Sequence, residues 1–412
     1  MEHSPANLQQ AATGRRLLLT RGTAFWLVAY MLGVTIMGNN IPAPLYPVYQ
    51  SLWHFSTAMI TVIFAVVALG VFPSLLFLGP LSDQRGRRPV LLLGVILATL
   101  ATLVFIFAQG VIWLIVARLL QGIAFGALSG TAAATLAELE PGGNARRAAL
   151  AATLTIVLSQ ATAPLLSGLL AQYAPWPTVL VFLILLVLLL PAVAGMWALP
   201  ETVAVQAGKM QLRPRFAIPA SIRRQFTLAS VAVFSAFGVV GLISSLGPSF
   251  ASTILHAQNR AIGGLVIFAL LGPSALAQLL CRNWPLRRLL VWGPILLAIG
   301  LALILFALPT HTLVVFILGT ACAGLGQGLT YLGSQEFVGS VATDDERGEV
   351  FSAFNVVVYF GASLVALGVG FGSGLIGLYP ATVVVVAVIG ILALGASLTS
   401  ARTRMLAHSS SV

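Results

Sequence analysis

The sequence predicts an all-α membrane protein in which twelve membrane-spanning helices form two six-helix bundles. Of its 412 residues, 59% are hydrophobic and only 8% are charged, whereas about a quarter of the residues in a soluble domain are charged. The mean hydropathy is +1.02, and the few charges are grouped so that long uncharged stretches separate them. Together these observations exclude a soluble enzyme.

The uncharged stretches set the number of spans, because a helix needs about 20 apolar residues to cross the hydrocarbon layer. The four longest stretches each hold two helices and a short turn. Residues 89–117 hold the third span and the start of the fourth, which continues past Arg118, and one span lies on each side of Arg260. The uncharged stretches are 22–82, 89–117, 148–200, 225–259, 261–281, 289–335 and 350–401.

The predicted N-terminal bundle, residues 24–198, follows a tail of residues 1–23. A polar linker, residues 199–225, joins it to a C-terminal bundle, residues 226–399, and residues 400–412 form a second tail. In chain order, the predicted spans are 24–45, 57–79, 89–109, 111–136, 148–171 and 177–198 in the first bundle and 226–247, 260–281, 289–308, 312–335, 349–370 and 378–399 in the second.

The basic residues predict how the chain is oriented in the membrane. All but two of the 21 basic residues lie in the tails or in loops that join one pair of spans to the next. Of the other two, Arg260 lies in a loop on the opposite side and Arg118 lies within a span. Positively charged loops stay in the cytoplasm, so both termini are predicted to be cytoplasmic, in a plasma membrane of the bacterial type. Orientation and anionic lipid headgroups therefore explain the net charge of +11 without nucleic acid.

Charged residues recur at nearly the same offset in the two halves. Arg87 and Arg287 each follow the second span of their half, and Glu138 and Glu336 each end the fourth. This correspondence favours a duplicated six-helix unit.

The loop after the second span carries a recognisable motif. It reads Gly-Pro-Leu-Ser-Asp-Gln-Arg-Gly-Arg-Arg over residues 79–88, which resembles the signature G-x-L-[SA]-D-x-x-G-R-[RK] of the major facilitator superfamily. Residues 118–122 match that superfamily's R-x-x-Q-G motif, and residues 199–202 resemble the LPET-type end of its sixth span. The resemblance implies two six-helix bundles and secondary transport, and it is closest to the twelve-span drug:proton antiporter group.

We interpret this loop as part of a conformational latch. Gly79 is predicted to allow close helix approach, and Gly86 to allow a bend with positive φ. Asp83 has the negative charge that suits a helix N-terminus; the resemblance implies that this helix is the eleventh span and that Arg87 pairs with Glu138. The alternative is a basic loop that only fixes topology. The predicted latch residues are Gly79, Asp83, Gly86, Arg87, Arg88 and Glu138.

Arg118 is a charge near the middle of the fourth span. Such a charge costs about 2.5–3.5 kcal/mol on insertion scales and usually faces a bundle interior or a wet cavity. We predict that Arg118, with Gln121, senses protonation or substrate. The alternative is an arginine that binds free backbone carbonyls and holds helices together.

The fifth span contains Ala-Pro-Leu-Leu-Ser-Gly over residues 163–168. This segment is similar to the G-P-x-x-G-G motif of the antiporter group, with two glycines replaced. Pro164 leaves the carbonyl of Gln160 without its helical donor, which predicts a bend or a dipole that faces a cavity. A proline kink with no transport role is the alternative.

Other polar side chains lie near the middle of predicted spans, where polar groups need partners. Single interhelical hydrogen bonds are one interpretation. As a set with Arg118, Gln121 and Gln160, these side chains are candidates for a substrate or coupling site at the membrane midplane between the halves. They are Asn39, Asn40, Gln327, Tyr331, Asn355 and Tyr359.

These patterns predict a secondary active transporter that exports a small organic solute by alternating access. The interiors of the predicted spans contain no Asp, Glu, His or Lys, so an enzyme would lack a catalytic cluster, and no phosphate-binding loop precedes Lys209. The alternative is an importer or facilitated-diffusion carrier of a metabolite or organic anion. We expect a monomer in the lipid bilayer that binds its small-molecule substrate and protons, without nucleic acid, cofactor or metal.

Intramembrane carboxylates ordinarily carry proton coupling, and the interiors of the predicted spans contain none. Either coupling runs through Glu138 with Asp83 at the inner face, or transport follows the gradient of the substrate without protons.

Overall fold

A computed structural model describes residues 19–203, 218–219, 221–343 and 347–402. These residues form helices and no strands. Eleven of the described helices are long and apolar enough to cross a membrane, and a further apolar helix, Leu180–Met196, is shorter. The predicted all-α fold with twelve apolar helical segments is therefore confirmed.

The first bundle follows the predicted spans closely. Polar caps start several of its helices: Thr20 accepts a hydrogen bond from the N–H of Thr23 at the start of α2, and Ser56 caps α4 in the same way. The helices are α2 (Arg21–Asn40), α4 (Thr57–Arg85), α5 (Arg87–Ile106), α6 (Val111–Leu139), α7 (Ala145–Tyr173) and α8 (Leu180–Met196).

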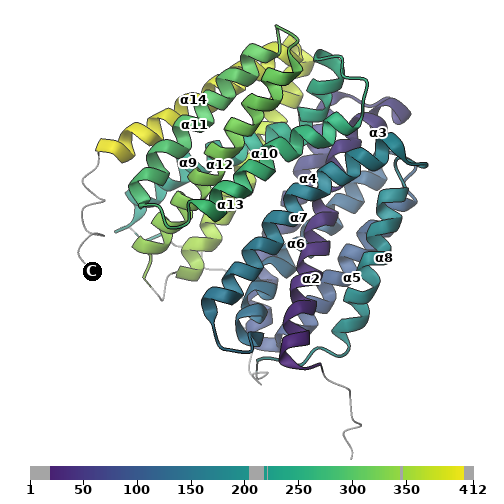
Figure 1. The fold of residues 1–412 in the computed structure, drawn as a ribbon, viewed down its shortest axis with the longest axis vertical. Coiled ribbons are helices and arrows are strands. Elements are labelled where there is room, and N and C mark those ends of the chain that lie inside the picture. The colour runs from purple at the N-terminus through teal and green to yellow at the C-terminus, as the bar shows by residue number, and fades with distance from the viewer. Residues whose placement is uncertain (1–18, 204–217, 220, 344–346, 403–412) are drawn as a thin grey trace, which may run out of the picture.

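The second bundle contains α9 (Arg223–Ser249), α10 (Ala261–Leu280), α11 (Leu286–Ala307), α12 (Leu313–Val341), α13 (Arg347–Ile376) and α14 (Leu378–Arg402). A short π-helix, η2 (Phe250–Ile254), extends α9. Figure 1 shows the purple-to-teal helices α2 to α8 in one group and the green-to-yellow helices α9 to α14 in another. The groups meet where α7 packs against α10 and α4 packs against α13.

The first span differs from its prediction after Asn40. The predicted span runs to residue 45, but α2 ends at Asn40 and the chain continues as a 3-10 turn, η1 (Ala43–Leu45), and a second helix, α3 (Tyr46–Trp53). Proline is compatible with the first turn of a helix, where its missing N–H has no partner to lose. Pro44 and Pro47 each occupy such a position.

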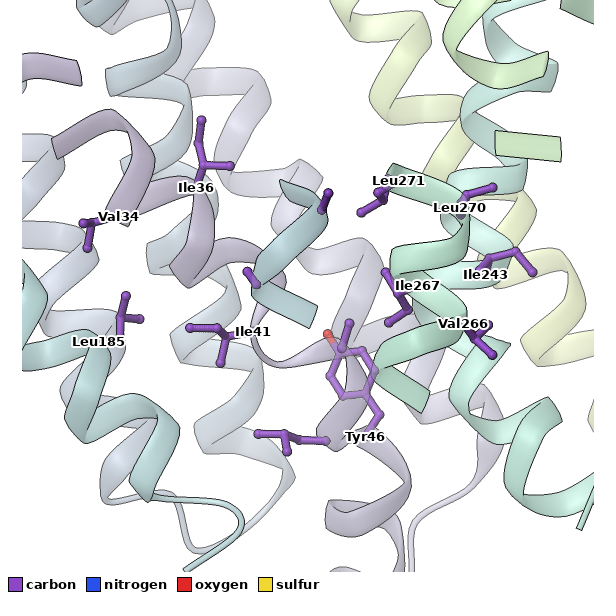
Figure 2. Packing of buried hydrophobic residues seen from close by; sticks show 14 of the residues in the cluster. Val34, Ile36, Ile41, Tyr46, Leu185, Ile243, Val266, Ile267, Leu270 and Leu271 are labelled. Carbon is purple, nitrogen blue, oxygen red and sulfur yellow. The ribbon is translucent and has the colours of Figure 1, made fainter. Parts of the chain in front are cut away.

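The segment η1–α3 packs between the two bundles. Tyr46 is fully buried and belongs to the same apolar cluster as Ile41 and Ile267 of α10. In Figure 2 its ring lies between residues of the first bundle and α10. The core at this end therefore joins both bundles.

Candidate functional site

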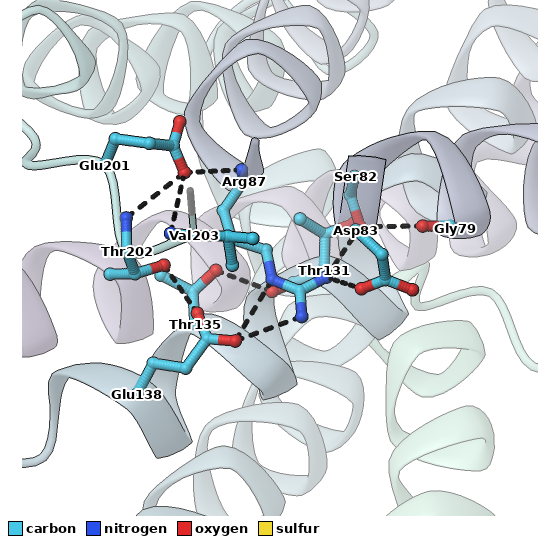
Figure 3. A network of polar contacts seen from close by, with 10 residues as sticks. All are labelled: Gly79, Ser82, Asp83, Arg87, Thr131, Thr135, Glu138, Glu201, Thr202 and Val203. Carbon is cyan, nitrogen blue, oxygen red and sulfur yellow. Dashed lines mark hydrogen bonds and ion pairs between the residues drawn. The ribbon is translucent and has the colours of Figure 1, made fainter. Parts of the chain in front are cut away.

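The predicted latch forms a polar network at one end of the first bundle, which we call the latch end (Asp83, Arg87 and Glu138). Arg87 pairs with Asp83 and with Glu138, whose Oε1 lies 3.0 Å from Arg87 Nη2. Arg87 also donates to the hydroxyl of Ser82 at 2.8 Å. The side chain of Arg87 is 12% exposed, so its charge is largely withdrawn from water and satisfied by this network (Figure 3).

Glu201 completes the network and was missed by the sequence reasoning. Its carboxylate accepts hydrogen bonds from the backbone N–H groups of Arg87 at 2.7 Å and Arg88 at 3.2 Å. These N–H groups open α5, where a helix has free donors and favours negative charge. The hydroxyl of Thr202 donates to Glu138 at 2.5 Å. The LPET-like segment therefore fastens the end of α8 to both α5 and α6.

Two of the predicted glycine roles have opposite outcomes. Gly86 has φ of 100°, as predicted, and a Cβ there would lie 2.5 Å from a carboxylate oxygen of Glu201. The close approach predicted at Gly79 is wrong in this structure, since a Cβ at Gly79 would meet open space. Gly79 lies inside α4, which continues to Arg85.

The expected contact of Asp83 with the eleventh span falls partly outside the described residues. Residues 344–346, directly before α13, are not described. Within the described part of the chain, the recorded partner of the Asp83 carboxylate is Arg87. Arg88 donates to the carbonyls of Met196 at 2.9 Å and Trp197 at 2.7 Å, so it anchors the end of α8.

A cavity of about 320 Å³ lies between the two bundles. It brings together five of the predicted substrate residues, contributed by both halves of the chain. These residues are Gln160 of α7, Gln327 and Tyr331 of α12, and Asn355 and Tyr359 of α13.

Several lining residues were not predicted. Ser274 of α10 donates to Gln327, and Gln278 donates to Ser274 at 3.2 Å, so a short polar chain crosses from α10 to α12. Phe125 and Phe237 also line the cavity. Sequence alone gave no signal for the two phenylalanines, because apolar rings are common in every span.

The cavity continues towards the latch end. A second cavity of about 380 Å³ shares Gln278, Tyr331 and Gln335 with the first. Its lining also includes Arg146 in the first turn of α7 and Arg282 just after α10. The sequence analysis did not include these two arginines among the candidate site residues.

The opposite end is closed by direct helix contact. A Cβ at Gly264 of α10 would lie 2.3 Å from the carbonyl oxygen of Pro164, and one at Gly168 would lie 2.9 Å from the Cα of Gly264. The antiporter-like segment is thus where α7 touches α10. Pro164 lies inside a single helix, α7, that runs from Ala145 to Tyr173.

Hydrogen bonds reinforce this closure between the ends of α7 and α10. The backbone N–H of Arg260 donates to Gln172 at 2.7 Å. Asn259 donates to the hydroxyl of Tyr173 at 3.1 Å.

Arg118 does not join the central cavity, and neither do Asn39, Asn40 and Gln121, contrary to the expectation of a single midplane set. Arg118 is 3% exposed and donates to the Asn39 carbonyl at 2.7 Å and to Gln121 at 2.9 Å. The Asn40 amide donates to the Ile36 carbonyl at 2.9 Å, within α2.

Pro42 provides the physical reason why Gln121 and Arg118 contact the end of α2. A proline has no N–H, so Pro42 leaves the carbonyl of Gly38, four residues earlier, without its helical donor. Gln121 supplies that donor at 2.8 Å. Arg118 and Gln121 therefore satisfy the free carbonyls at the end of α2, which agrees with the alternative reading of Arg118.

The fold and the cavity define a class: a membrane transporter with a central cavity between two helical bundles. The family description Major Facilitator Superfamily matches residues 27–366. The chain belongs to the major facilitator superfamily, and it is a multi-pass protein of the bacterial inner membrane.

Among characterised proteins, the chain is 35% identical over 150 residues to the multidrug transporter MdfA of Yersinia pestis bv. Antiqua (strain Angola). It is 36% identical over 140 residues to multidrug resistance protein D of Escherichia coli (strain K12). Each match spans about a third of the chain and of the relative. Multidrug resistance protein MdtL of Vibrio parahaemolyticus serotype O3:K6 (strain RIMD 2210633) matches 68% of the chain and 72% of its own length at 24% identity.

Solved structures share the fold at low identity. A bacterial homologue of the human lysosomal transporter Spinster, in an inward-facing and unoccupied conformation, superposes with a TM-score of 0.75 and 15% identity over 93% of this chain and 97% of that one. The nucleoside transporter NupG gives a TM-score of 0.70 with 10% identity over 92% of this chain and 99% of that one.

Proposed function

We propose that the chain exports small organic solutes by alternating access. The observation that carries this proposal is the central cavity, which continues to the latch end while contact between α7 and α10 closes the opposite end. A carrier needs such a site, reachable from one side at a time, near the middle of the membrane. The multidrug relatives favour export over the alternative of uptake.

The proposal assigns the latch end to the cytoplasm. Arg85, Arg87 and Arg88 lie there, as do Arg146 and Arg282, and basic loops stay inside. The structure then corresponds to the state open to the cytoplasm, with both termini on that side. In this proposal residues 24–198 and 226–399 move as two bodies about the linker at 199–225, and a monomer in the bilayer acts without covalent chemistry, nucleic acid, cofactor or metal.

Coupling is proposed to run through the latch. Glu138 and Asp83 both form ion pairs with Arg87, so protonation of either carboxylate removes one of the interactions that hold the Arg87 side chain in place.

Glu140 is a further acid at this end that the sequence analysis did not use. It is 2% exposed, accepts from the N–H of Asn144 at 2.7 Å and lies 3.4 Å from Arg147.

Inverted membrane vesicles test the proposal. A panel of fluorescent organic solutes is added with and without a pH gradient that is acidic inside the vesicle. The proposal expects at least one solute to accumulate in vesicles that contain the chain and not in vesicles that lack it. Arg87→Ala should abolish accumulation at matched expression, whereas Arg85→Ala, the same change in the same loop, should not.

The coupling step has a separate readout. Loss of accumulation on adding an uncoupler, together with loss in Glu138→Gln, supports coupling through the latch. Proton-driven accumulation that survives both Glu138→Gln and Asp83→Asn would contradict it. Equilibration that ignores the uncoupler would show transport down the substrate gradient alone.

A further inference from the structure

The chemistry of the cavity wall restricts the charge of what it can bind. Apart from apolar groups, the central cavity presents amides, hydroxyls and aromatic rings. Among the described residues that line it, none carries a formal charge. The charged side chains described along the connected second cavity are both arginines, Arg146 and Arg282.

Some of the amides are free to bind a ligand. Within the described part of the chain, the side-chain amides of Gln160 and Asn355 have no hydrogen-bond partner in the protein, and both line the cavity. They come from α7 and α13, on opposite bundles. A solute that carries hydrogen-bonding groups can therefore contact both bundles at once, each amide offering a donor and an acceptor.

Aromatic rings supply the apolar part of the wall. Tyr359 packs edge-on to Phe125, with ring centroids 6.2 Å apart, and Tyr331 packs edge-on to Phe237 at 5.1 Å. All four residues line the cavity. Flat solutes can stack on such rings without any particular pattern of polar contacts.

A cation is disfavoured in this setting. Moving an ion from water into a protein interior carries a large desolvation penalty that a paired opposite charge normally offsets. Aromatic rings offset it in part through cation–π attraction, which is the smaller term. The described lining residues include neither the acids at the latch end (Asp83, Glu138, Glu140 and Glu201) nor Glu336 of α12. A cation that enters passes Arg146 and Arg282.

We propose that the central cavity selects uncharged aromatic solutes that carry hydrogen-bonding groups and discriminates against organic cations of the same size. The inference rests on the proposed function, because it takes the cavity to be the transport site. It also replaces the earlier alternative of an organic anion, since Arg118, the arginine predicted within a span, bonds to the end of α2 and does not line the cavity.

Three triphenyl probes of nearly equal shape test the charge rule. They are triphenylphosphine oxide, which is neutral and has one strong acceptor, methyltriphenylphosphonium, a cation, and triphenylacetate, an anion. Binding is measured by equilibrium dialysis at pH 8 on the full-length chain in nanodiscs of phosphatidylcholine, with empty nanodiscs subtracted. We expect the oxide to bind at least tenfold more tightly than either ion.

Two variants should reverse the preference. Gln160→Glu and Asn355→Asp each place one carboxylate in the cavity, from opposite bundles. Each should raise the affinity for the phosphonium relative to the oxide by tenfold or more. Gln258→Glu is the matched control: it makes the same chemical change in the exposed loop before α10, outside the central cavity, and should leave the ratio at the wild-type value.

Phosphonium or acetate binding in the wild type as tight as the oxide would overturn the inference, and so would the absence of binding by all three probes. An unchanged ratio in both cavity variants would also overturn it. None of these results bears on solute accumulation in vesicles, so failure of the charge rule and failure of the transporter proposal are distinguishable.

Discussion

At the scale of single residues, Gly86 is a position where both the backbone geometry and the neighbouring contacts require glycine. Its φ of 100° and ψ of 155° lie in a region that is almost restricted to glycine. A Cβ would also overlap the Glu201 carboxylate that caps α5. The turn between α4 and α5 therefore depends on the absence of a side chain.

Gly86→Ala should destabilise the folded protein by about 1–3 kcal/mol, because it adds backbone strain and displaces Glu201. Thermal unfolding in detergent, followed by tryptophan fluorescence, measures the effect. Gly390→Ala is the control, since a Cβ there meets open space within α14 and alanine favours a helix over glycine. Equal unfolding midpoints for the two variants would contradict this role of Gly86.

Arg118 was predicted to sense protonation or substrate, but in the structure it bonds to the Asn39 carbonyl and to Gln121. Arg118→Ala should leave the Asn39 carbonyl and the Gln121 side chain without their buried partner, at a cost of about 1–3 kcal/mol for each group. We expect a lower unfolding midpoint but nearly unchanged affinity for a ligand of the central cavity, measured by equilibrium dialysis. Lost affinity with unchanged stability would restore the prediction that Arg118 contacts substrate.

The residue patterns predicted the latch partners but not the hydrogen bonds from Arg118 and Gln121 to the carbonyls at the end of α2. Arg87 and Glu138 were paired from a motif resemblance, and the structure places them 3.0 Å apart. The partners of Arg118 were not predictable, because one is the backbone carbonyl of Asn39 and the other is Gln121, which in turn donates to the Gly38 carbonyl that Pro42 frees. Neither the periodicity nor the composition of the sequence indicates which helix packs against the end of α2.

At the scale of elements, the latch joins the α4–α5 turn, the end of α6 and the segment after α8. Arg87 contacts the first two, and Glu201 and Thr202 add the third. We therefore expect a change at one of these carboxylates to alter the relative positions of α5, α6 and α8.

Arg87 and Glu138 should be energetically coupled. In a double-mutant cycle of Arg87→Ala and Glu138→Gln, the combined loss of stability should fall short of the sum of the single losses by about 0.5–3 kcal/mol. Unfolding in denaturant measures each term. Arg85→Ala with Glu138→Gln serves as the control pair and should be additive; equal coupling in both pairs would reduce the latch to a general charge effect.

The contact between α7 and α10 should hold the end away from the latch closed, so weakening it should open that end. Gly264→Ala places a methyl group 2.3 Å from the Pro164 carbonyl, so the closed end cannot keep its present packing. We expect a cysteine at Ser252, which lines a cavity at that end, to react several-fold faster with a membrane-impermeant thiol reagent. Gly374→Ala, where a Cβ meets open space, should leave the rate unchanged, and an unchanged rate in Gly264→Ala would contradict this account of closure.

Most elements were predictable because long apolar helices leave a strong signal in the positions of charges. The exception is η1–α3, a segment that contains Pro44 and Pro47. Proline interrupts a helix but also starts one well, and the sequence does not distinguish these uses without knowing what the next segment packs against. Here it packs at the contact between the bundles.

At the scale of the whole molecule, both bundles contribute to the cavity, and they touch at the end away from the latch. Arg118 and Gln121 were predicted to form one midplane set with Gln160 and Asn355, but of these four residues the cavity is lined by Gln160 and Asn355. Their meeting in one cavity depends on how two bundles dock, which no local pattern encodes. Alternating access requires the two bundles to move relative to each other, so that the end at the α7–α10 contact opens as the latch end closes.

Distances between spin labels at the two ends test this claim most directly. In a background without cysteines, one pair is placed at Ala149 and Leu279, beside the cavity mouth, and the other at Ser51 and Gln258, at the closed end. On going from the wild type to Gly264→Ala, and on adding a solute found to be exported, the first distance should shorten while the second lengthens. Distances that stay fixed, or that change in the same direction at both ends, would contradict alternating access in this protein.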